Sequence, residues 1–189
     1  ADVTVALSTS GTATEGTDYT DGSGAIDDIV ISAGSTTGTV SFTPTDDSLY
    51  DAASNETATI AISGVSGGSA SESGTQTVTI TITDNESAPT VTLATSGTSI
   101  AENSASTLTL TATLSGATYQ DVTVSIGSSG TATEGTDYGT VSDITISAGA
   151  TTGTSTFDPT DDSDETDTVT ATLAITGVSG GGATESGSQ

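Results

Sequence analysis

The acidic side chains are the groups in this sequence whose types and spacing could do chemistry. Asp46 and Asp47 are adjacent, Asp84 follows a run of alternating apolar and hydroxyl residues, and Asp18 directly precedes Tyr19. Several carboxylates from different loops can bind Ca²⁺, which takes about six to eight oxygen ligands at about 2.3–2.6 Å. The competing interpretation is that acidic turns only solvate the surface of an acidic protein. The choice between them depends on whether the fold brings these loops together.

The composition favours a cation as a ligand and excludes several other partners. The 189 residues include 25 acidic residues and no Lys, Arg or His, so the formal net charge is −25 at pH 7. Clustered carboxylates therefore have no basic neighbour to offset their repulsion. Without Lys or Arg the chain cannot displace counterions from nucleic acid or dock on an anionic membrane through a basic patch. Without His or Cys it has no Ser–His or Cys–His nucleophile.

We predict that the chain is not an enzyme. A pair of carboxylates can act as an acid–base dyad, but Asp46 and Asp47 are adjacent, and adjacent residues of a strand point to opposite faces. Aromatic residues make up only 3% of the chain, so the sequence shows no aromatic platform for carbohydrate. A host or surface ligand therefore cannot be named from the sequence.

The apolar residues predict an all-β protein. They are only 31% of the chain, but they alternate with Ser and Thr in short runs, which is typical of half-buried strands. Glycine-rich turns separate the runs at the spacing of an antiparallel sandwich. In each expected strand of the first copy the apolar residues lie on one face. These sets are Val3, Val5 and Leu7; Ile29 and Ile31; Val40 and Phe42; Ala58, Ile60 and Ile62; and Val78, Ile80 and Ile82. No apolar stretch approaches the roughly 18 residues of a membrane-spanning helix, so we predict no membrane insertion.

The chain repeats itself. Residues 2–19 match residues 121–138, residues 28–48 match 143–163, and residues 64–76 match 177–189, so the offset between copies falls from 119 to 113 residues along the chain. The break at residues 85–89 (NESAP) predicts two domains, 1–87 and 88–189. Pro89 cannot donate to a strand ladder, which supports a junction there.

Each copy contains strands that the other lacks. Residues 88–120 supply early strands to the second copy only, and residues 77–84 supply a last strand to the first copy only. Two explanations fit: the chain is part of a longer tandem array, or strands are exchanged between subunits of a fibre. In either case we expect neighbouring repeats or subunits to be arranged end to end.

The order of the motifs resembles the Calx-beta domain. GTATEGTDY, an ISAG turn followed by TTGT, the acidic turn PTDDS and the final strand TVTITITDNE occur in this order in the first copy, and most recur in the second. The resemblance covers nearly the whole chain. It implies tandem immunoglobulin-like antiparallel β-sandwiches and calcium bound at one pole by carboxylates from several loops.

The resemblance also implies two sets of metal ligands. The first copy supplies Asp18, Asp46, Asp47, Asp51 (with Glu56 as its alternative), Asp84 and Glu86. The second supplies Glu102, Asp137, Asp161, Asp162 and, as alternatives for one further acid, Asp164 or Glu165. Each set is short of one group, because the first copy lacks the early Glu and the second lacks terminal acids. We expect Glu15 and Glu134 only to face solvent, and Tyr19 and Tyr138 to be packing residues.

The leading functional hypothesis is an extracellular structural and adhesive module, a calcium-stiffened spacer in a bacterial surface protein or fibre. One alternative is a fibre subunit that polymerises by strand exchange between chains. Another is a calcium-sensing regulatory domain, which normally needs a linked transport or signalling region.

Overall fold

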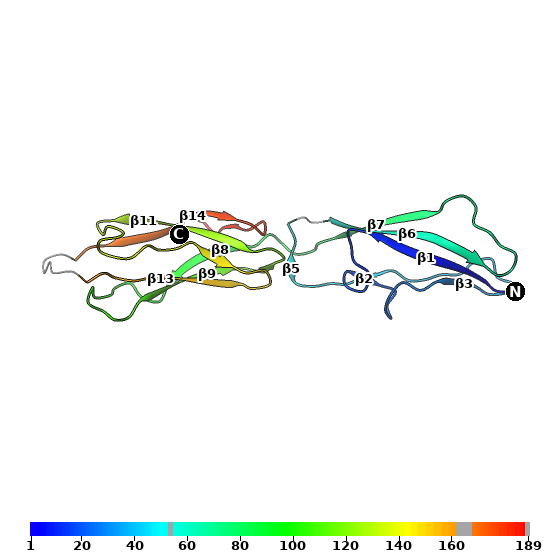
Figure 1. Cartoon of the computed structure of the whole chain (residues 1–189), viewed down its shortest axis with the longest axis horizontal. Coiled ribbons are helices and arrows are strands. Elements are labelled where there is room, and N and C mark those ends of the chain that lie inside the picture. Colours follow the sequence, from blue (N-terminus) through cyan, green and yellow to red (C-terminus); the bar gives the residue numbers. More distant parts are fainter. Residues whose placement is uncertain (53–54, 162–167, 188–189) are drawn as a thin grey trace. The chain divides into compact units, whose positions relative to one another are not determined.

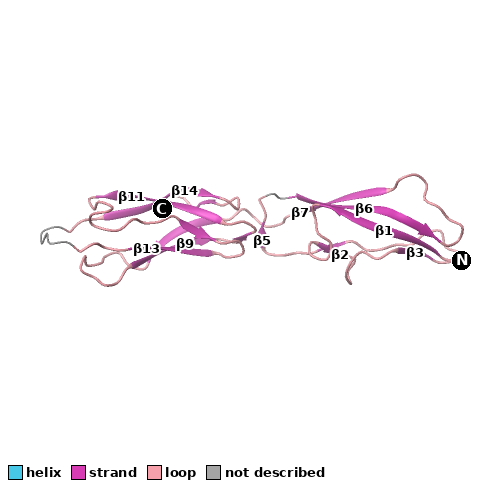
Figure 2. Ribbon diagram, in the orientation of Figure 1, coloured by secondary structure: helices cyan, strands magenta, loops and turns pink. Residues whose placement is uncertain are grey.

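The structure, a computed structural model, describes residues 1–52, 55–161 and 168–187, and every regular element in this part of the chain is a β-strand (Figure 2). The prediction of an all-β protein built from antiparallel sandwiches is therefore confirmed. The chain divides into two compact units, one comprising Ala1–Asp47 and Ala53–Asp84, and the other Ser48–Ala52 and Asn85–Gln189.

The first unit is built around one antiparallel sheet of four strands. The strand order is β3 (Ile29–Ile31), β1 (Val3–Gly11), β6 (Asn55–Ser66) and β7 (Thr77–Thr83), and the long strands can be followed in Figure 1. A separate pair joins β2 (Tyr19–Thr20) to β4 (Thr43–Pro44). The short strand β5 (Leu49–Tyr50) belongs by its contacts to the second unit, where it pairs in parallel with β10 (Ala117–Thr118).

The second unit contains two larger sheets. The first has the order β12 (Ile144–Ile146), β11 (Val122–Gly130) and β14 (Ala171–Ser179). The second has the order β13 (Thr152–Phe157), β9 (Leu108–Leu114), β8 (Thr90–Thr95) and β15 (Thr184–Glu185). Apolar side chains from both sheets form one core: Val91, Leu110, Ala112, Leu114, Val122, Val124, Ile144, Ile146, Ile175 and Ala183.

The repeated sheet has the same register in both units but a different degree of burial. Val3 pairs with Ile31 in the first unit, and Val122 pairs with Ile146 in the second. Val122 and Ile146 are completely buried, whereas Val3 and Ile31 are only half-buried. The difference arises because β8 and β9 cover this face in the second unit, and the first unit has no described equivalent of them.

One predicted strand is wrong. Residues 37–42, which include Val40 and Phe42, are not in a strand, although the matching residues form β13 in the second unit. β13 is a strand because it pairs with β9 along its whole length. The path of the backbone is nevertheless similar, since a Cβ on Gly38 or on Gly153 would come within 2.5 Å of a carbonyl oxygen of the neighbouring strand.

Aspartates outside the predicted sites hold the backbone of the repeated sheet. The β1–β6 and β11–β14 pairs each contain a bulge, in which β6 and β14 carry the extra residue opposite Ala6–Leu7 and opposite Ser125–Ile126. The N–H at the bulge donates to an aspartate Oδ1 in both units, from Leu7 to Asp28 and from Ile126 to Asp143, at 3.0 Å in each. Asp2 and Asp121 accept in the same way from the N–H groups of turns, at 2.8 Å. Carboxylates thus serve as backbone acceptors in a chain that has no basic side chains.

Candidate functional site

The turn that carries the first predicted ligand is closed by that ligand. Thr14 N–H donates to Asp18 Oδ2 at 2.5 Å, and Asp18 N–H donates back to the Thr14 carbonyl at 2.9 Å. In the second unit Thr133 N–H donates to Asp137 Oδ2 at 2.6 Å, with the same return bond at 2.9 Å. Asp18 and Asp137 therefore have a structural role of their own, which also fixes where their carboxylates lie.

Backbone hydrogen bonds bring the acidic turn beside this loop. Thr45 N–H donates to the Asp18 carbonyl at 2.9 Å, so Asp46 and Asp47 follow directly after a residue that contacts Asp18. The second unit repeats this arrangement, because Thr160 N–H donates to the Asp137 carbonyl at 2.9 Å and Asp161 comes next. Two loops separated by more than twenty residues thus meet at a defined point in each unit.

Stacked aromatic rings support this junction. Tyr19 stacks on Phe42 and Tyr138 on Phe157, with ring centroids 4.7 Å apart in both pairs. Each tyrosine is only 1% exposed. The prediction that these tyrosines are packing residues is confirmed. Because each tyrosine follows its aspartate directly, the stack limits the movement of the aspartate backbone.

Strand register places a further predicted ligand at the same end of the first unit. Asn55, the first residue of β6, pairs with Thr83, the last residue of β7. Gly11, the last residue of β1, pairs with Ala58 close to the start of β6. Asp84, which follows β7, therefore lies at the end of the sheet that also carries the loop of Asp18. Asp84 and Asp18 are half-buried, and Asp46 and Asp47 are exposed.

The other predicted ligands are distributed differently. Asp51 lies in Ser48–Ala52 and is grouped with the second unit, as are Glu86 and Glu102. Glu56, the alternative to Asp51, stays in the first unit near the start of β6. Three predicted ligands of the second copy lie outside the described residues: Asp162, Asp164 and Glu165.

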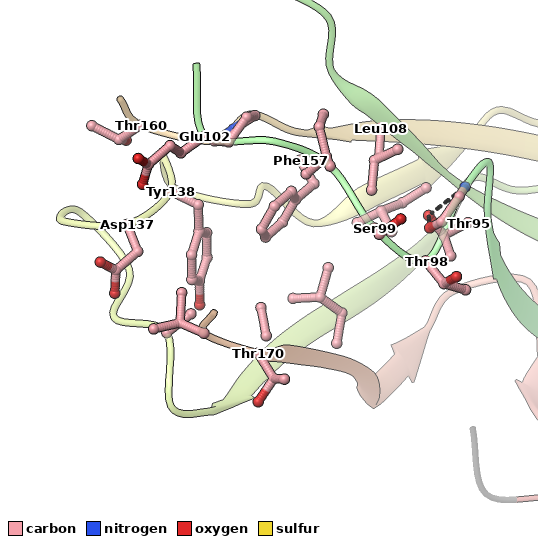
Figure 3. A pocket seen from close by; sticks show the side chains of 18 of the residues that line it. Thr95, Thr98, Ser99, Glu102, Leu108, Asp137, Tyr138, Phe157, Thr160 and Thr170 are labelled. Atoms are coloured by element: carbon pink, nitrogen blue, oxygen red, sulfur yellow. Dashed lines mark hydrogen bonds between the residues drawn. The ribbon is translucent and has the colours of Figure 1, made fainter. Parts of the chain in front are cut away.

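A cavity of about 630 Å³ in the second unit contains two of the predicted ligands in its wall. Glu102 and Asp137 both line it, and so does Thr160, the residue before Asp161. Figure 3 shows the labelled side chains of Glu102, Asp137 and Thr160 on the same side of the cavity as Tyr138. Much of the remaining wall is apolar: Leu93, Ile100, Leu108, Leu110, Phe157, Val169 and Leu173.

The carboxylates of the described residues do not form a complete metal site. In residues 1–52, 55–161 and 168–187, no three His, Cys, Asp or Glu side chains lie close enough together to hold a metal ion. The donors that do gather are carboxylate oxygens, which suit Ca²⁺ and not a soft metal. In each unit the structure thus brings together the loop of the first aspartate and the acidic turn, without a cluster of three carboxylates among the described residues.

The expectation that Glu15 only faces solvent is wrong. Glu15 is half-buried, its Oε2 accepts from Thr9 Oγ1 at 2.7 Å, and its Oε1 accepts from Ile26 N–H. Ile26 lies between the repeated segments 2–19 and 28–48, where the first copy is four residues longer than the second, so the sequence of the second copy gave no indication of this bond. Glu134 is exposed, and it accepts from Ser128 Oγ at 3.4 Å.

Two consecutive all-β units that share one sheet register, one bulge and one acid-closed loop define a tandem β-sandwich repeat protein. The family model of the Calx-beta domain matches residues 1–86 and again residues 84–170. The chain therefore belongs to the Calx-beta domain family and contains two of its repeats.

Membership of this family describes the kind of module that the chain contains. Calx-beta domains are non-catalytic, extracellular-type β-sandwich modules that are associated with calcium binding. No curated protein matches the chain. The part of the chain that the structure describes contains no helix that is long and apolar enough to cross a membrane.

Proposed function

We propose that this chain is an extracellular structural and adhesive module, a calcium-stabilised spacer of a bacterial surface protein or fibre. Its two repeats, 1–87 and 88–189, would connect end to end with neighbouring repeats or subunits. Such a module is not an enzyme and has no nucleic-acid partner. The observation that carries this proposal is the convergence of acidic loops at one end of each unit, in a chain without any basic side chain.

Calcium would act on this convergence as a cross-link. In the first unit Asp18 and the turn of Asp46 and Asp47 are already joined by a backbone hydrogen bond, and Asp84 lies at the same strand end. In the second unit Glu102 and Asp137 share a cavity wall, and Asp161 adjoins it. A cation held by such groups neutralises charges that otherwise repel one another, so it favours the folded loops over the unfolded chain.

Thermal unfolding with and without calcium tests the proposal. A ligand that binds only the folded state stabilises it by about 2.7 kcal/mol when its concentration is about 100 times its dissociation constant. We expect calorimetry in millimolar Ca²⁺ to show a higher Tm than in chelator, at matched ionic strength set with NaCl. An unchanged Tm would refute the role of calcium.

Two variants show whether the shift arises at the predicted site. The double variant Asp46→Asn, Asp47→Asn should lose the calcium-dependent shift of the first unit. The matched control is Glu72→Gln, because Glu72 lies between β6 and β7 at the other end of the sheet, where it accepts from Gln76 N–H at 2.9 Å. The control should keep the shift. Equal shifts in both variants would place calcium elsewhere.

A further inference from the structure

The residues that follow the acidic turn differ between the two repeats. Ser48 is followed by Leu49 and Tyr50 in the first repeat, whereas the matching Ser163 is followed by two acidic residues, Asp164 and Glu165. The turns themselves, TDDS in both repeats, are identical. The first repeat therefore has an apolar and an aromatic side chain where the second repeat has two carboxylates.

Leu49 and Tyr50 form a strand that the second unit binds. They make up β5, which pairs in parallel with Ala117 and Thr118 of β10. Tyr119 N–H also donates to the Tyr50 carbonyl at 3.0 Å, and both side chains of β5 are half-buried. By its contacts the segment Ser48–Ala52 belongs to the second unit, although the segments on both sides of it in the sequence belong to the first.

The second unit holds the receiving strand with its own residues. Thr118 is completely buried, and its Oγ1 donates to the Gln120 carbonyl at 2.6 Å. The Thr118 carbonyl accepts from Gly149 N–H at 2.9 Å. The turn Gly180–Gly182 lies against β10, since a Cβ on Gly181 would come within 2.9 Å of Thr118 Cβ. β10 and this turn thus form a surface that is fixed by contacts other than those with β5.

Gly182 is the glycine of this turn that faces Tyr50. A Cβ on Gly182 would lie 2.6 Å from Tyr50 Cε1 and 3.2 Å from both Tyr50 Oη and Ala52 Cβ. Glycine permits such a close approach because it has no Cβ. The backbone conformation alone does not require glycine, because the matching residue of the first repeat is Ser69, with φ +58° against +61° for Gly182. The space that Tyr50 occupies is therefore the reason for a glycine at position 182.

We propose that the surface formed by β10 and the Gly180–Gly182 turn is a binding site for the Leu49–Tyr50 segment of the preceding repeat, and that Gly182 determines which segments it accepts. Main-chain pairing with β10 supplies affinity, and the tyrosine ring beside Gly182 supplies specificity. A segment with two carboxylates, such as the one after Ser163, offers no ring for this space. The inference rests on the proposed role as one repeat among neighbours, but not on calcium.

Amide exchange in the ¹⁵N-labelled intact chain tests the docking of Tyr50. We expect Tyr50→Ala to speed exchange of the Tyr119 amide by about tenfold or more, because β5 opens more often when no ring holds it in place. Tyr50→Phe, which keeps the ring, is the matched control and should leave the protection of Tyr119 nearly unchanged. Unchanged protection in Tyr50→Ala, or a loss in Tyr50→Phe as large as in Tyr50→Ala, would overturn the proposal.

Exchanging the turn residues between the repeats tests the specificity. Gly182→Ser places in the second repeat the residue that the first repeat has at the matching position, and Ser69→Gly is the reciprocal control. Gly182→Ser should displace the tyrosine ring and speed exchange of the Tyr119 amide, whereas Ser69→Gly should not. Circular dichroism melts check that both variants fold. A folded Gly182→Ser variant with unchanged protection of Tyr119 would refute selection by Gly182.

A double-variant cycle separates a clash with the ring from a disturbance of the turn. If the serine acts on the ring, Gly182→Ser should have little further effect on Tyr119 exchange in the Tyr50→Ala background. The same effect in both backgrounds would show that the serine disturbs only the turn, and the specificity role of Gly182 would then be wrong.

The docking and calcium proposals can fail independently of each other. The exchange measurements are run in Ca²⁺ and in chelator. Protection of Tyr119 that depends on Tyr50 in both solutions, together with a calcium-insensitive Tm, supports the docking site and refutes the calcium role. A calcium-dependent Tm with Tyr119 protection that does not depend on Tyr50 refutes the docking site and leaves the calcium role standing.

Discussion

Replacing Asp143 by alanine should destabilise the second unit, because its carboxylate holds β11 where that strand faces the bulge of β14. Oδ1 accepts from Ile126 N–H and Oδ2 accepts from Ser125 Oγ, both at 3.0 Å. A hydrogen bond to a charged group contributes about 1.5–3 kcal/mol, and a buried donor left without an acceptor costs about 1–3 kcal/mol. Asp143 is exposed and Ile126 is half-buried. Water can therefore replace part of the bond, and we expect a loss of about 1–2 kcal/mol, toward the lower end of these ranges.

Asp143→Asn is the matched control. The amide keeps an oxygen that can accept from Ile126, so its loss should be clearly smaller than that of the alanine variant. Both variants remove one negative charge from a chain of net charge −25. The reduction in self-repulsion works against the predicted destabilisation and is common to both. The comparison between them therefore isolates the hydrogen bond.

Urea unfolding followed by far-ultraviolet circular dichroism provides the measurement, with the midpoint and slope fitted for each variant. The reasoning would be refuted if Asp143→Ala matched the parent protein, or if the alanine and asparagine variants lost the same free energy. Asp28→Ala extends the test to the first unit. Asp28 accepts from Leu7 N–H at 3.0 Å, and residue 6 is alanine where the second unit has Ser125, so we expect a smaller loss there.

Three further predictions concern single positions. Gly130→Ala should lower the free energy of unfolding by more than about 3 kcal/mol, because φ is +118° and an added Cβ would lie 2.1 Å from a backbone oxygen. Gly116→Ala, which has open space around the added Cβ, should be nearly neutral in the same urea assay. Tyr138→Ala should cost about 3–5 kcal/mol, as for other large buried aromatic residues, and Tyr138→Phe should keep the stacking and most of the stability in a thermal melt. The hydrogen bonds that the Ser23 backbone and side chain donate hold the pKa of Asp21 below its ordinary value of 3.8. The contribution of Asp21 to stability is therefore present above pH 3.8 and is lost as the pH falls through the lower pKa of the folded state. A carboxyl NMR titration of Asp21 with a midpoint at or above 3.8 would contradict this.

The local sequence patterns predicted most of the strands of the repeated sheet, but not which segments pair with one another. Period-two alternation located β1, β11, β6 and β14, because a half-buried sheet face requires that period whichever strands flank it. It did not predict that residues 37–42 form no strand and pair with no neighbouring strand among the described residues. Strand pairing is a property of two segments, and the partner of β13 has no described equivalent in the first unit.

The candidate site was predictable in its loops and not in its details. The repeated GTATEGTDY and PTDDS motifs indicated that Asp18 and Asp46 would meet, and the Thr45–Asp18 backbone bond shows why they do. No motif predicted that Asp18 accepts from Thr14 N–H or that Glu15 accepts from Ile26 N–H. Both bonds depend on where the folded loop places the donor N–H.

The amino-acid sequence by itself determined the all-β class, the tandem repeat, the absence of basic side chains that could pair with the carboxylates, and the set of loops that carry carboxylates. These follow from composition and periodicity, which are local. Only the tertiary structure decided which of the equivalent segments become strands and which apolar faces are covered. Asn55 is in a strand because β7 lies beside it, and its equivalent Thr168 is not. Val122 is buried and Val3 is not, because burial and pairing are set by neighbours distant in the chain.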